Sequence, residues 1–251
     1  MAIFLYQQAI AVPLVKALSV SANTAFAVFL TWALGREIDP ANEWSAFVAL
    51  PAVFFLSLIF DRPAFLALLF ILLFSRTLNG TSGLQVKISD SILLIILGAL
   101  LFYNGMITAP VILAVVFCID AYLVPTNRKQ IIFALVSVPV VYVTSLFYLK
   151  NEITFIGLEP QVLFVSLLIL VAALTIIALT RHNLVYDDEN RLMLNRHRVV
   201  AAQVLVALFM VGELNLKGNV TVHLLYPAAF ACFGVALYHL ARLLQGSVYK
   251  R

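Results

Sequence analysis

The segment Val162–Thr180 reads VLFVSLLILVAALTIIALT and contains no charged residue. A helix needs about 20 mostly apolar residues to cross the ~30 Å hydrocarbon core of a bilayer. Comparable apolar runs recur along the whole chain, in which 63% of the 251 residues are hydrophobic and only 11% are charged. A soluble fold of this size cannot bury so much apolar surface. The sequence therefore predicts a polytopic integral membrane protein, an all-α bundle of transmembrane helices.

The apolar runs and their polar interruptions predict about nine spans, with about eight to ten admissible. The expected spans are Leu18–Gly35, Ala41–Phe60, Pro63–Ser75, Ser91–Tyr103, Ile107–Val124, Gln130–Leu149, Val162–Thr180, Val199–Gly212 and Val222–Leu243. Pro63–Ser75 and Ser91–Tyr103 are short for a span, so they extend into flanking residues, lie against protein, or form re-entrant segments. Residues 1–16 are apolar but broken by Gln and Pro, and we interpret them as an interfacial segment. Because no polar linker divides the chain, residues 1–251 are expected to form one membrane domain.

The basic residues divide unequally when the loops of this arrangement alternate between two faces. Of the 16 Lys and Arg residues, 12 fall on one face and four on the other. The larger set is Arg36, Arg76, Lys87, Arg128, Lys129, Arg181, Arg191, Arg196, Arg198, Arg242, Lys250 and Arg251. Short cytoplasmic loops carry an excess of basic residues. We therefore expect a multi-pass protein of the cell membrane with its N-terminus outside, its C-terminus inside, and residues 181–198 as the longest cytoplasmic loop.

The overall charge has the same origin. The formal net charge of +4 follows from the basic loops and does not imply a nucleic-acid partner. The expected partners are the lipid bilayer itself, an anionic lipid or small-molecule ligand, and other membrane subunits.

Several acidic residues stand where helices are expected to begin. Asp39 precedes Pro40, Asp61 precedes Arg62-Pro63, and Asp90 lies between two serines. A short acidic side chain accepts hydrogen bonds from the free N–H groups of a helix N-terminus and complements its dipole. We interpret Asp39, Asp61 and Asp90 as capping residues, and the run 187–189 as a solvated cap.

Asp120 and Glu213 do not fit that interpretation, because both lie toward the C-terminal ends of their expected helices. The helix dipole disfavours a carboxylate at this end, so a compensating group is needed. For Asp120 we expect an ion pair with a basic residue of the cytoplasmic face, with Arg76 or Arg128 favoured. Glu213 is interpreted as a snorkelling or loop residue near Lys217.

The cytoplasmic segments combine Arg, Asn and Thr with Gly and Pro turns. Arginine offers bidentate hydrogen bonds to anions, and the amides of turns add further donors. The sequence therefore suggests a substrate or headgroup site at the cytoplasmic mouth of a cavity between helices. The alternative is that these residues are the ordinary snorkelling charges of a membrane surface. The candidate binding residues are Arg36, Arg76, Asn79, Asp120 and Arg128.

Catalytic and metal-binding patterns are weak. The string Gly80-Thr81-Ser82-Gly83 matches the Gly-x-Ser-Gly of intramembrane serine proteases, but it continues into a polar connection rather than a buried helix. His223 and His239 are too far apart on one helix to share a metal ion. Cys118 and Cys232 are interpreted as packing residues. We therefore assign no catalytic residue, no metal ligand and no cofactor.

Three kinds of function are compatible with these features. The favoured one is a transporter or permease-like bundle for a small or anionic substrate. The others are a membrane enzyme or binding protein for an anionic lipid, with its site at the cytoplasmic face, and a structural or accessory subunit of a membrane complex. A transport path would be lined by Asn23, Thr24, Asn104, Gln203 and Tyr226.

Overall fold

A computed structural model of the chain describes residues 14–60, 63–81, 87–123, 129–137, 139, 159–179, 195–217 and 219–248. These residues form helices joined by short turns, and none of them is in a strand. The elements are α2 (Leu14–Ile38), the 3-10 helix η1 (Glu43–Phe47), α3 (Leu50–Leu56), α4 (Phe65–Asn79), α5 (Ile88–Tyr103), α6 (Thr108–Leu123), α8 (Pro160–Leu179), α9 (Arg196–Lys217) and α10 (Asn219–Val248). The all-α class expected from the sequence is confirmed for this part of the chain.

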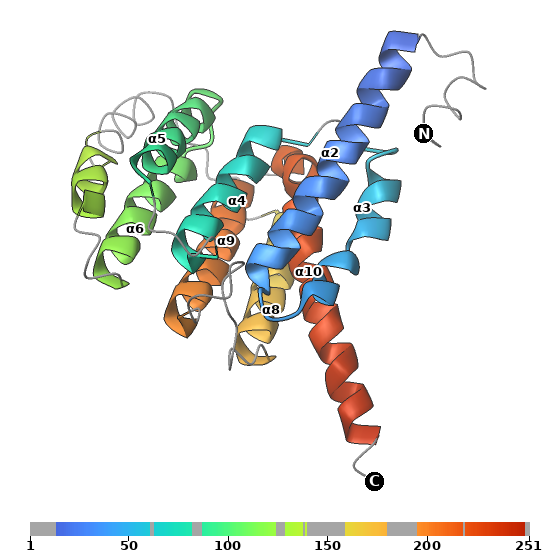
Figure 1. The fold of residues 1–251 in the computed structure, drawn as a ribbon. Helices are drawn as coiled ribbons and strands as arrows, with labels where there is room; N and C mark the ends of the chain where they lie inside the picture. Colours follow the sequence, from blue (N-terminus) through green and yellow to red (C-terminus); the bar gives the residue numbers. More distant parts are fainter. Residues whose placement is uncertain are drawn as a thin grey trace.

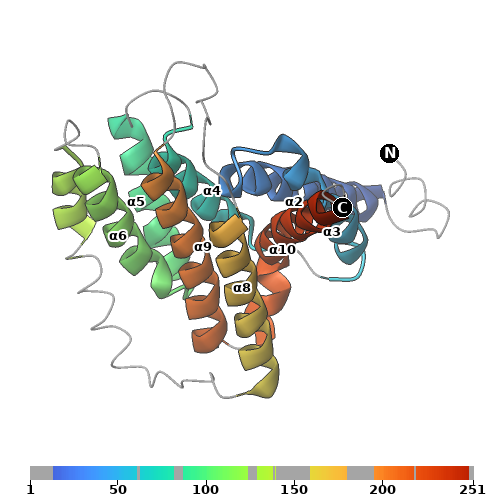
Figure 2. The same ribbon diagram turned by 90° about the horizontal axis from the view of Figure 1, so that it is seen from below.

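The helices pack around a central pair, α4 and α9 (Figure 1). Helices α5 and α6 lie on one side of this pair, and α2, α3 and α10 lie on the other (Figure 2). Helix α8 packs against both α9 and α10. Segments far apart in the sequence, such as α2 and α10, therefore become direct neighbours.

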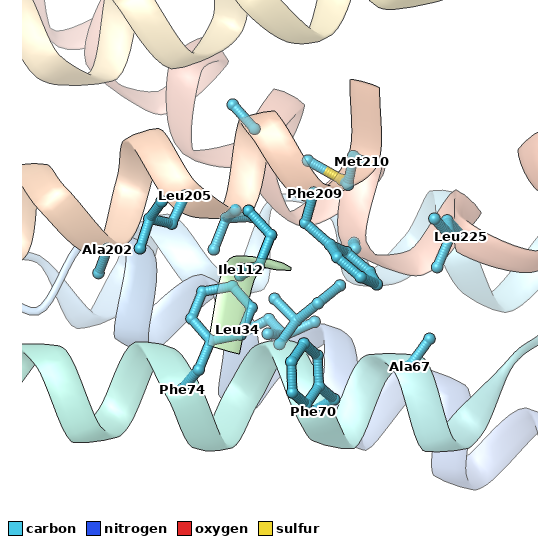
Figure 3. Packing of buried hydrophobic residues seen from close by; sticks show 14 of the residues in the cluster. Leu34, Ala67, Phe70, Phe74, Ile112, Ala202, Leu205, Phe209, Met210 and Leu225 are labelled. Carbon is cyan, nitrogen blue, oxygen red and sulfur yellow. The ribbon is translucent and has the colours of Figure 1, made fainter. Parts of the chain in front are cut away.

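The core is apolar and continuous from side to side of the bundle. Phe70 and Phe74 of α4 point toward Leu205 and Phe209 of α9 (Figure 3), and the rings of Phe70 and Phe209 have centroids 5.6 Å apart. Leu34 of α2 belongs to the same cluster of fully buried side chains. In lipid the alternative to this burial is contact with acyl chains, so close van der Waals packing, rather than exclusion of water, stabilises the bundle.

The outer surface is also apolar, as expected of helices that face lipid. Within the described residues, four helical segments are long and apolar enough to cross a membrane, namely Leu14–Ile38, Pro160–Leu179, Arg196–Leu216 and Leu224–Gln245. Helix α8 illustrates this, because Phe164, Leu167 and Leu174 are all more than half exposed. These helices are compatible with an integral membrane protein.

The two short expected spans are longer than the apolar runs suggested. Helix α4 continues past Ser75 to Asn79, and α5 begins at Ile88 rather than Ser91. Both helices therefore extend into flanking residues, and α4 also lies against protein, as its contacts with α2 and α9 show. Of the expected span Gln130–Leu149, residues 130–137 and 139 are described, and they are helical. Residues 1–13 and the greater part of the loop 181–198 lie outside the described residues.

The expected span Ala41–Phe60 is not a single regular α-helix. The chain there forms η1, a turn at residues 48–49, and the seven-residue helix α3, which starts with Pro51 in its first turn. This segment packs closely against α2 and α10. A Cβ on Gly35 of α2 would lie 2.9 Å from Ala46 Cα, and a Cβ on Gly234 of α10 would lie 2.8 Å from Ala49 N. The broken segment thus fits against α2 and α10 only because both helices present a glycine.

The polar contacts show which helix ends lie together. The C-terminal ends of α2, α4 and α6 meet the N-terminal end of α9, and we call this region the polar end of the bundle. At the opposite end, Ala64 N donates to Leu224 O at 3.0 Å, and Thr108 contacts Glu213. The expected alternation of these helices agrees with this arrangement.

Candidate functional site

The centre of the polar end is an ion pair between α9 and α6. Arg198 Nη2 lies 2.8 Å from Asp120 Oδ1, and the Asp120 side chain is fully buried. The same guanidinium donates from Nη2 to Thr77 O at 2.8 Å and from Nε to Leu78 O. The last carbonyls of a helix have no partner within that helix, and they carry the negative end of its dipole. Arg198 therefore neutralises Asp120 and the C-terminal end of α4 together.

The chain of α4 is shaped to receive Arg198. Gly80 follows the helix with φ of +68°, a left-handed conformation, and its N–H donates to Arg76 O. Glycine adopts this conformation without steric cost, which is why it commonly ends helices. The turn leaves the carbonyls of residues 77 and 78 accessible to the guanidinium, which passes 3.6 Å from the position of a Cβ on Gly80.

A second set of contacts joins α2 to the end of α4. Asn79 Nδ2 donates to Glu37 O at 2.6 Å and to Glu37 Oε2 at 3.1 Å. The hydroxyl of Thr81 donates to the same carboxylate at 3.0 Å. All three side chains are buried, although they are separated by about 40 residues in sequence. The polar turn after α4 therefore holds the carboxylate at the end of α2.

A third contact joins α2 to α10. His239 Nε2 lies 2.9 Å from Asp39 Oδ2, and Asn42 Nδ2 donates to both oxygens of the same carboxylate at 3.2 Å. Asp39 is fully buried, and Arg242 reaches the group through Asn42 Oδ1 at 2.9 Å. The expectation that Asp39 is only a capping residue is wrong. The residue that precedes η1 is Asn42, and its side chain makes no capping bond.

The other capping expectations have different outcomes. Asp90 is confirmed, because it lies in the first turn of α5 and its carboxylate accepts from Lys87 N at 3.4 Å. Asp61 and the run 187–189 lie outside the described residues.

The structure brings only part of the expected binding set together. Asn79 and Asp120 are buried at the polar end, in contact with Glu37 and Arg198. Arg36 is half-exposed, lies 3.4 Å from Glu43, and stacks on Trp32. Arg76 is exposed on the outer face of α4, and Arg128 lies outside the described residues.

The pairing of Asp120 with a basic residue is confirmed, and the partner within the described residues is Arg198. Arg128, one of the two favoured partners, lies outside the described residues. The packing of α6 against α9 brings in a residue 78 positions away.

The expectation that Glu213 is a snorkelling or loop residue is also wrong. It is fully buried rather than snorkelling, and its Oε1 accepts from Thr108 N at 2.9 Å and from the Thr108 hydroxyl at 2.5 Å. The N–H groups at the start of a helix are free to donate, and the positive end of the α6 dipole stabilises the carboxylate. The dipole that disfavours Glu213 in its own helix is therefore offset by that of a neighbouring helix.

The expected path residues do not form one line. Thr24, Gln203 and Tyr226 are buried, whereas Asn104 is exposed and bonds to Leu100 O at the end of α5. Asn23 is partly exposed. Gln203 belongs to the polar end, because its Nε2 donates to Ile38 O at 2.7 Å.

Sequence reasoning missed Glu37, Thr81, Arg198 and His239 as members of this site. From the sequence, Arg198 is only one of the basic residues that indicate membrane topology, and His239 is weighed only as a metal ligand. Within the described ranges, no group of three or more His, Cys, Asp or Glu side chains is placed to hold a metal ion. A signal was present in Glu37-Ile38-Asp39, where two carboxylates flank an apolar residue at a helix end.

The polar end thus joins five helices through buried charges and amides. Such groups are costly inside a membrane protein, and they commonly mark functional regions. Comparison with protein-family models, with curated proteins and with solved structures finds no match.

Proposed function

We propose that the protein is a transporter or permease-like protein of the cell membrane for a small, anionic substrate, and that the polar end is its gate. The observation that carries this proposal is the set of buried polar contacts that join different helices. Asp120–Arg198 joins α6 to α9, Asp39–His239 joins α2 to α10, and Glu37–Asn79 joins α2 to α4.

Each of these contacts must break if the helices separate at this end. Removing one partner of a buried ion pair costs about 3–5 kcal/mol, because the other charge is left without compensation. A substrate that supplies a replacement partner lowers that cost. Helices that have two discrete sets of contacts can then switch between closed and open arrangements.

The chemistry of Arg198 favours an anionic substrate. Its guanidinium is the buried cation of the gate, and Arg binds carboxylates and phosphates through two parallel hydrogen bonds. An anion that displaces Asp120 would keep Arg198 paired while α6 moves away from α9. The proposal thus gives the same residue a role in closing the gate and in binding the substrate.

The test is solute entry into proteoliposomes that contain the full chain, followed by stopped-flow light scattering. Imposed gradients of sodium L-lactate, sodium phosphate and sodium chloride serve as probes, with protein-free liposomes as the reference. We expect faster entry of at least one anion, and a changed rate in Asp120→Asn. Asp90→Asn is the matched control, because Asp90 is exposed and caps α5. Entry at the protein-free rate for all three solutes would contradict the proposal.

A further inference from the structure

Three buried side chains of the polar end have oxygen atoms without a hydrogen-bond partner among the described residues. They are Ser75 Oγ, Asn79 Oδ1 and Gln203 Oε1. The exposed fractions of these residues are 1%, 1% and 4%. A buried acceptor without a partner is costly, so such groups are normally bound to protein, water or a ligand.

The amide orientations are fixed by their donors. Asn79 Nδ2 lies 2.6 Å from Glu37 O, and Gln203 Nε2 lies 2.7 Å from Ile38 O. Exchanging the nitrogen and oxygen of either amide would place two acceptors against each other. Both amide oxygens therefore remain acceptors, and both amides are bound to consecutive carbonyls at the end of α2.

The register of α4 against α9 places the third oxygen at the same level. Arg198 lies beside Thr77 and Leu78, and the ring of Phe209 packs on Phe70. Helices α4 and α9 are therefore antiparallel. Interpolation between the two contacts sets Gln203 at about the level of residues 74–75 of α4. Ser75 also lies one helical turn from Asn79, so both are on the same face of α4.

The surroundings favour a positively charged ligand. The C-terminal end of α2 presents the negative end of its dipole here, whereas that of α4 is already paired with Arg198. The Glu37 carboxylate is held beside Asn79 at 3.1 Å. Neutral oxygens are suited to hard cations, and helix C-terminal ends coordinate Na⁺ in membrane transporters.

We propose that Ser75, Asn79 and Gln203 form a binding site for a monovalent alkali cation such as Na⁺ at the junction of α2, α4 and α9. Binding of this cation is a property of the folded bundle and does not require transport. Its further role as the ion that drives anion uptake rests on the proposed function. Because binding and transport are measured separately, either statement can fail without the other.

The test is thermal unfolding of the full chain, purified in detergent, in choline chloride with added NaCl or KCl at constant ionic strength. We expect saturable stabilisation by one of the two alkali cations relative to choline. Binding of ²²Na⁺ to the same sample, with unlabelled NaCl and KCl as competitors, measures the affinity directly.

Ser75→Ala is the informative variant, because the serine hydroxyl has no hydrogen bond to lose within the described chain. We expect it to weaken cation binding about tenfold or more, as loss of a group at a metal site does. Ser21→Ala is the matched control. Ser21 Oγ is likewise buried without a partner among the described residues, but it lies on α2 about 24 Å along the helix from Glu37.

Gln203→Met provides a second variant, which removes the amide oxygen. We expect cation binding to weaken about tenfold or more, and stability without the cation to fall as well, because the hydrogen bond from Nε2 to Ile38 O is lost. Equal stabilisation by choline, Na⁺ and K⁺ would overturn the proposal and assign the three oxygens to water alone. Equal effects of Ser75→Ala and Ser21→Ala on binding would overturn it as well.

Discussion

Arg198 contacts three groups at the polar end, namely Asp120 and the carbonyls of Thr77 and Leu78. Its guanidinium neutralises Asp120 and also donates hydrogen bonds to two carbonyls at the end of α4. An ion pair of this kind is not simply a source of stability, because both charges must first be removed from water. Its measurable property is the large cost of losing only one partner.

Asp120→Ala and Arg198→Ala are each expected to destabilise the bundle by about 3–5 kcal/mol, because each leaves the other charge buried. The double substitution Asp120→Leu with Arg198→Leu should cost less than the sum of the two single substitutions, since no charge is then left without a partner. Reversible unfolding in detergent measures all three. A double variant that loses the full sum would show that the two residues do not interact.

The pair Arg36–Glu43 is the natural control for that experiment. It joins oppositely charged side chains at 3.4 Å, but Glu43 is largely exposed. Exposed pairs contribute only about 0–1 kcal/mol. Glu43→Gln should therefore leave the unfolding transition nearly unchanged.

Gly80 supports a prediction about backbone conformation. At φ of +68°, a residue with a branched side chain is strained, whereas Asn tolerates this region. Gly80→Val should cost about 1–2 kcal/mol or more, and Gly80→Asn markedly less. An added Cβ at Gly80 would lie 3.6 Å from the nearest atom of Arg198, which is an ordinary contact. A clash of Cβ therefore does not explain the expected difference between Val and Asn. Equal losses in unfolding free energy would contradict the assignment to backbone strain.

At the scale of elements, the break between η1 and α3 is the feature that the apolar pattern hides. Residues 41–60 are mostly apolar, yet the regular α-helix is interrupted at residues 48–49, where the segment packs against α2 and α10. The fit depends on backbone approaching backbone at Gly35 and Gly234. Small residues at helix interfaces allow this approach in membrane proteins.

Gly234→Ala is expected to destabilise the bundle by about 1–3 kcal/mol, the range for overpacking a tight contact. The added methyl would lie 2.8 Å from Ala49 N, a backbone atom that moves only if the whole turn moves. Gly98→Ala is the matched control, because the nearest atom there is the flexible end of Leu113 at 3.1 Å. Thermal unfolding in detergent should show the larger loss for Gly234→Ala. The reverse order would contradict the backbone contact.

At the scale of the whole molecule, the direction of each helix links the charge pattern to topology. The helix ends at the polar end belong to segments that carry most of the basic residues, including Arg76, Lys87 and Arg196. The positive-inside rule predicts that this end faces the cytoplasm. The start of α5 and the end of α5 then lie on opposite sides of the membrane.

Cysteine labelling in cells tests that orientation. In a background with Cys118→Ser and Cys232→Ala, Ser89→Cys should react with a membrane-impermeant maleimide only after permeabilisation. Asn104→Cys should react in intact cells. Ser89 and Asn104 are exposed at the two ends of α5, so the membrane rather than the protein limits access of the maleimide to the introduced cysteines. Labelling of Ser89→Cys, but not Asn104→Cys, in intact cells would reverse the topology.

Hydropathy and local chain chemistry determined a large part of this protein. The run at residues 162–180 predicted α8, and Asp90 marked the beginning of a helix as the structure has it. These features depend on residues within one or two helical turns, so they can be read from the sequence. The need of Asp120 for a cation followed from the same local argument, because a helix dipole is a property of one helix.

The identity of each buried partner was decided only by the tertiary structure. Arg198 meets Asp120 across 78 positions, and His239 meets Asp39 across 200. Which residue compensates a buried charge depends on which helix faces pack together, and periodicity along one helix contains no information on that choice. Apolar composition therefore selects the membrane and the helices, whereas the packing of α2, α4, α6, α9 and α10 selects the chemistry of the polar end.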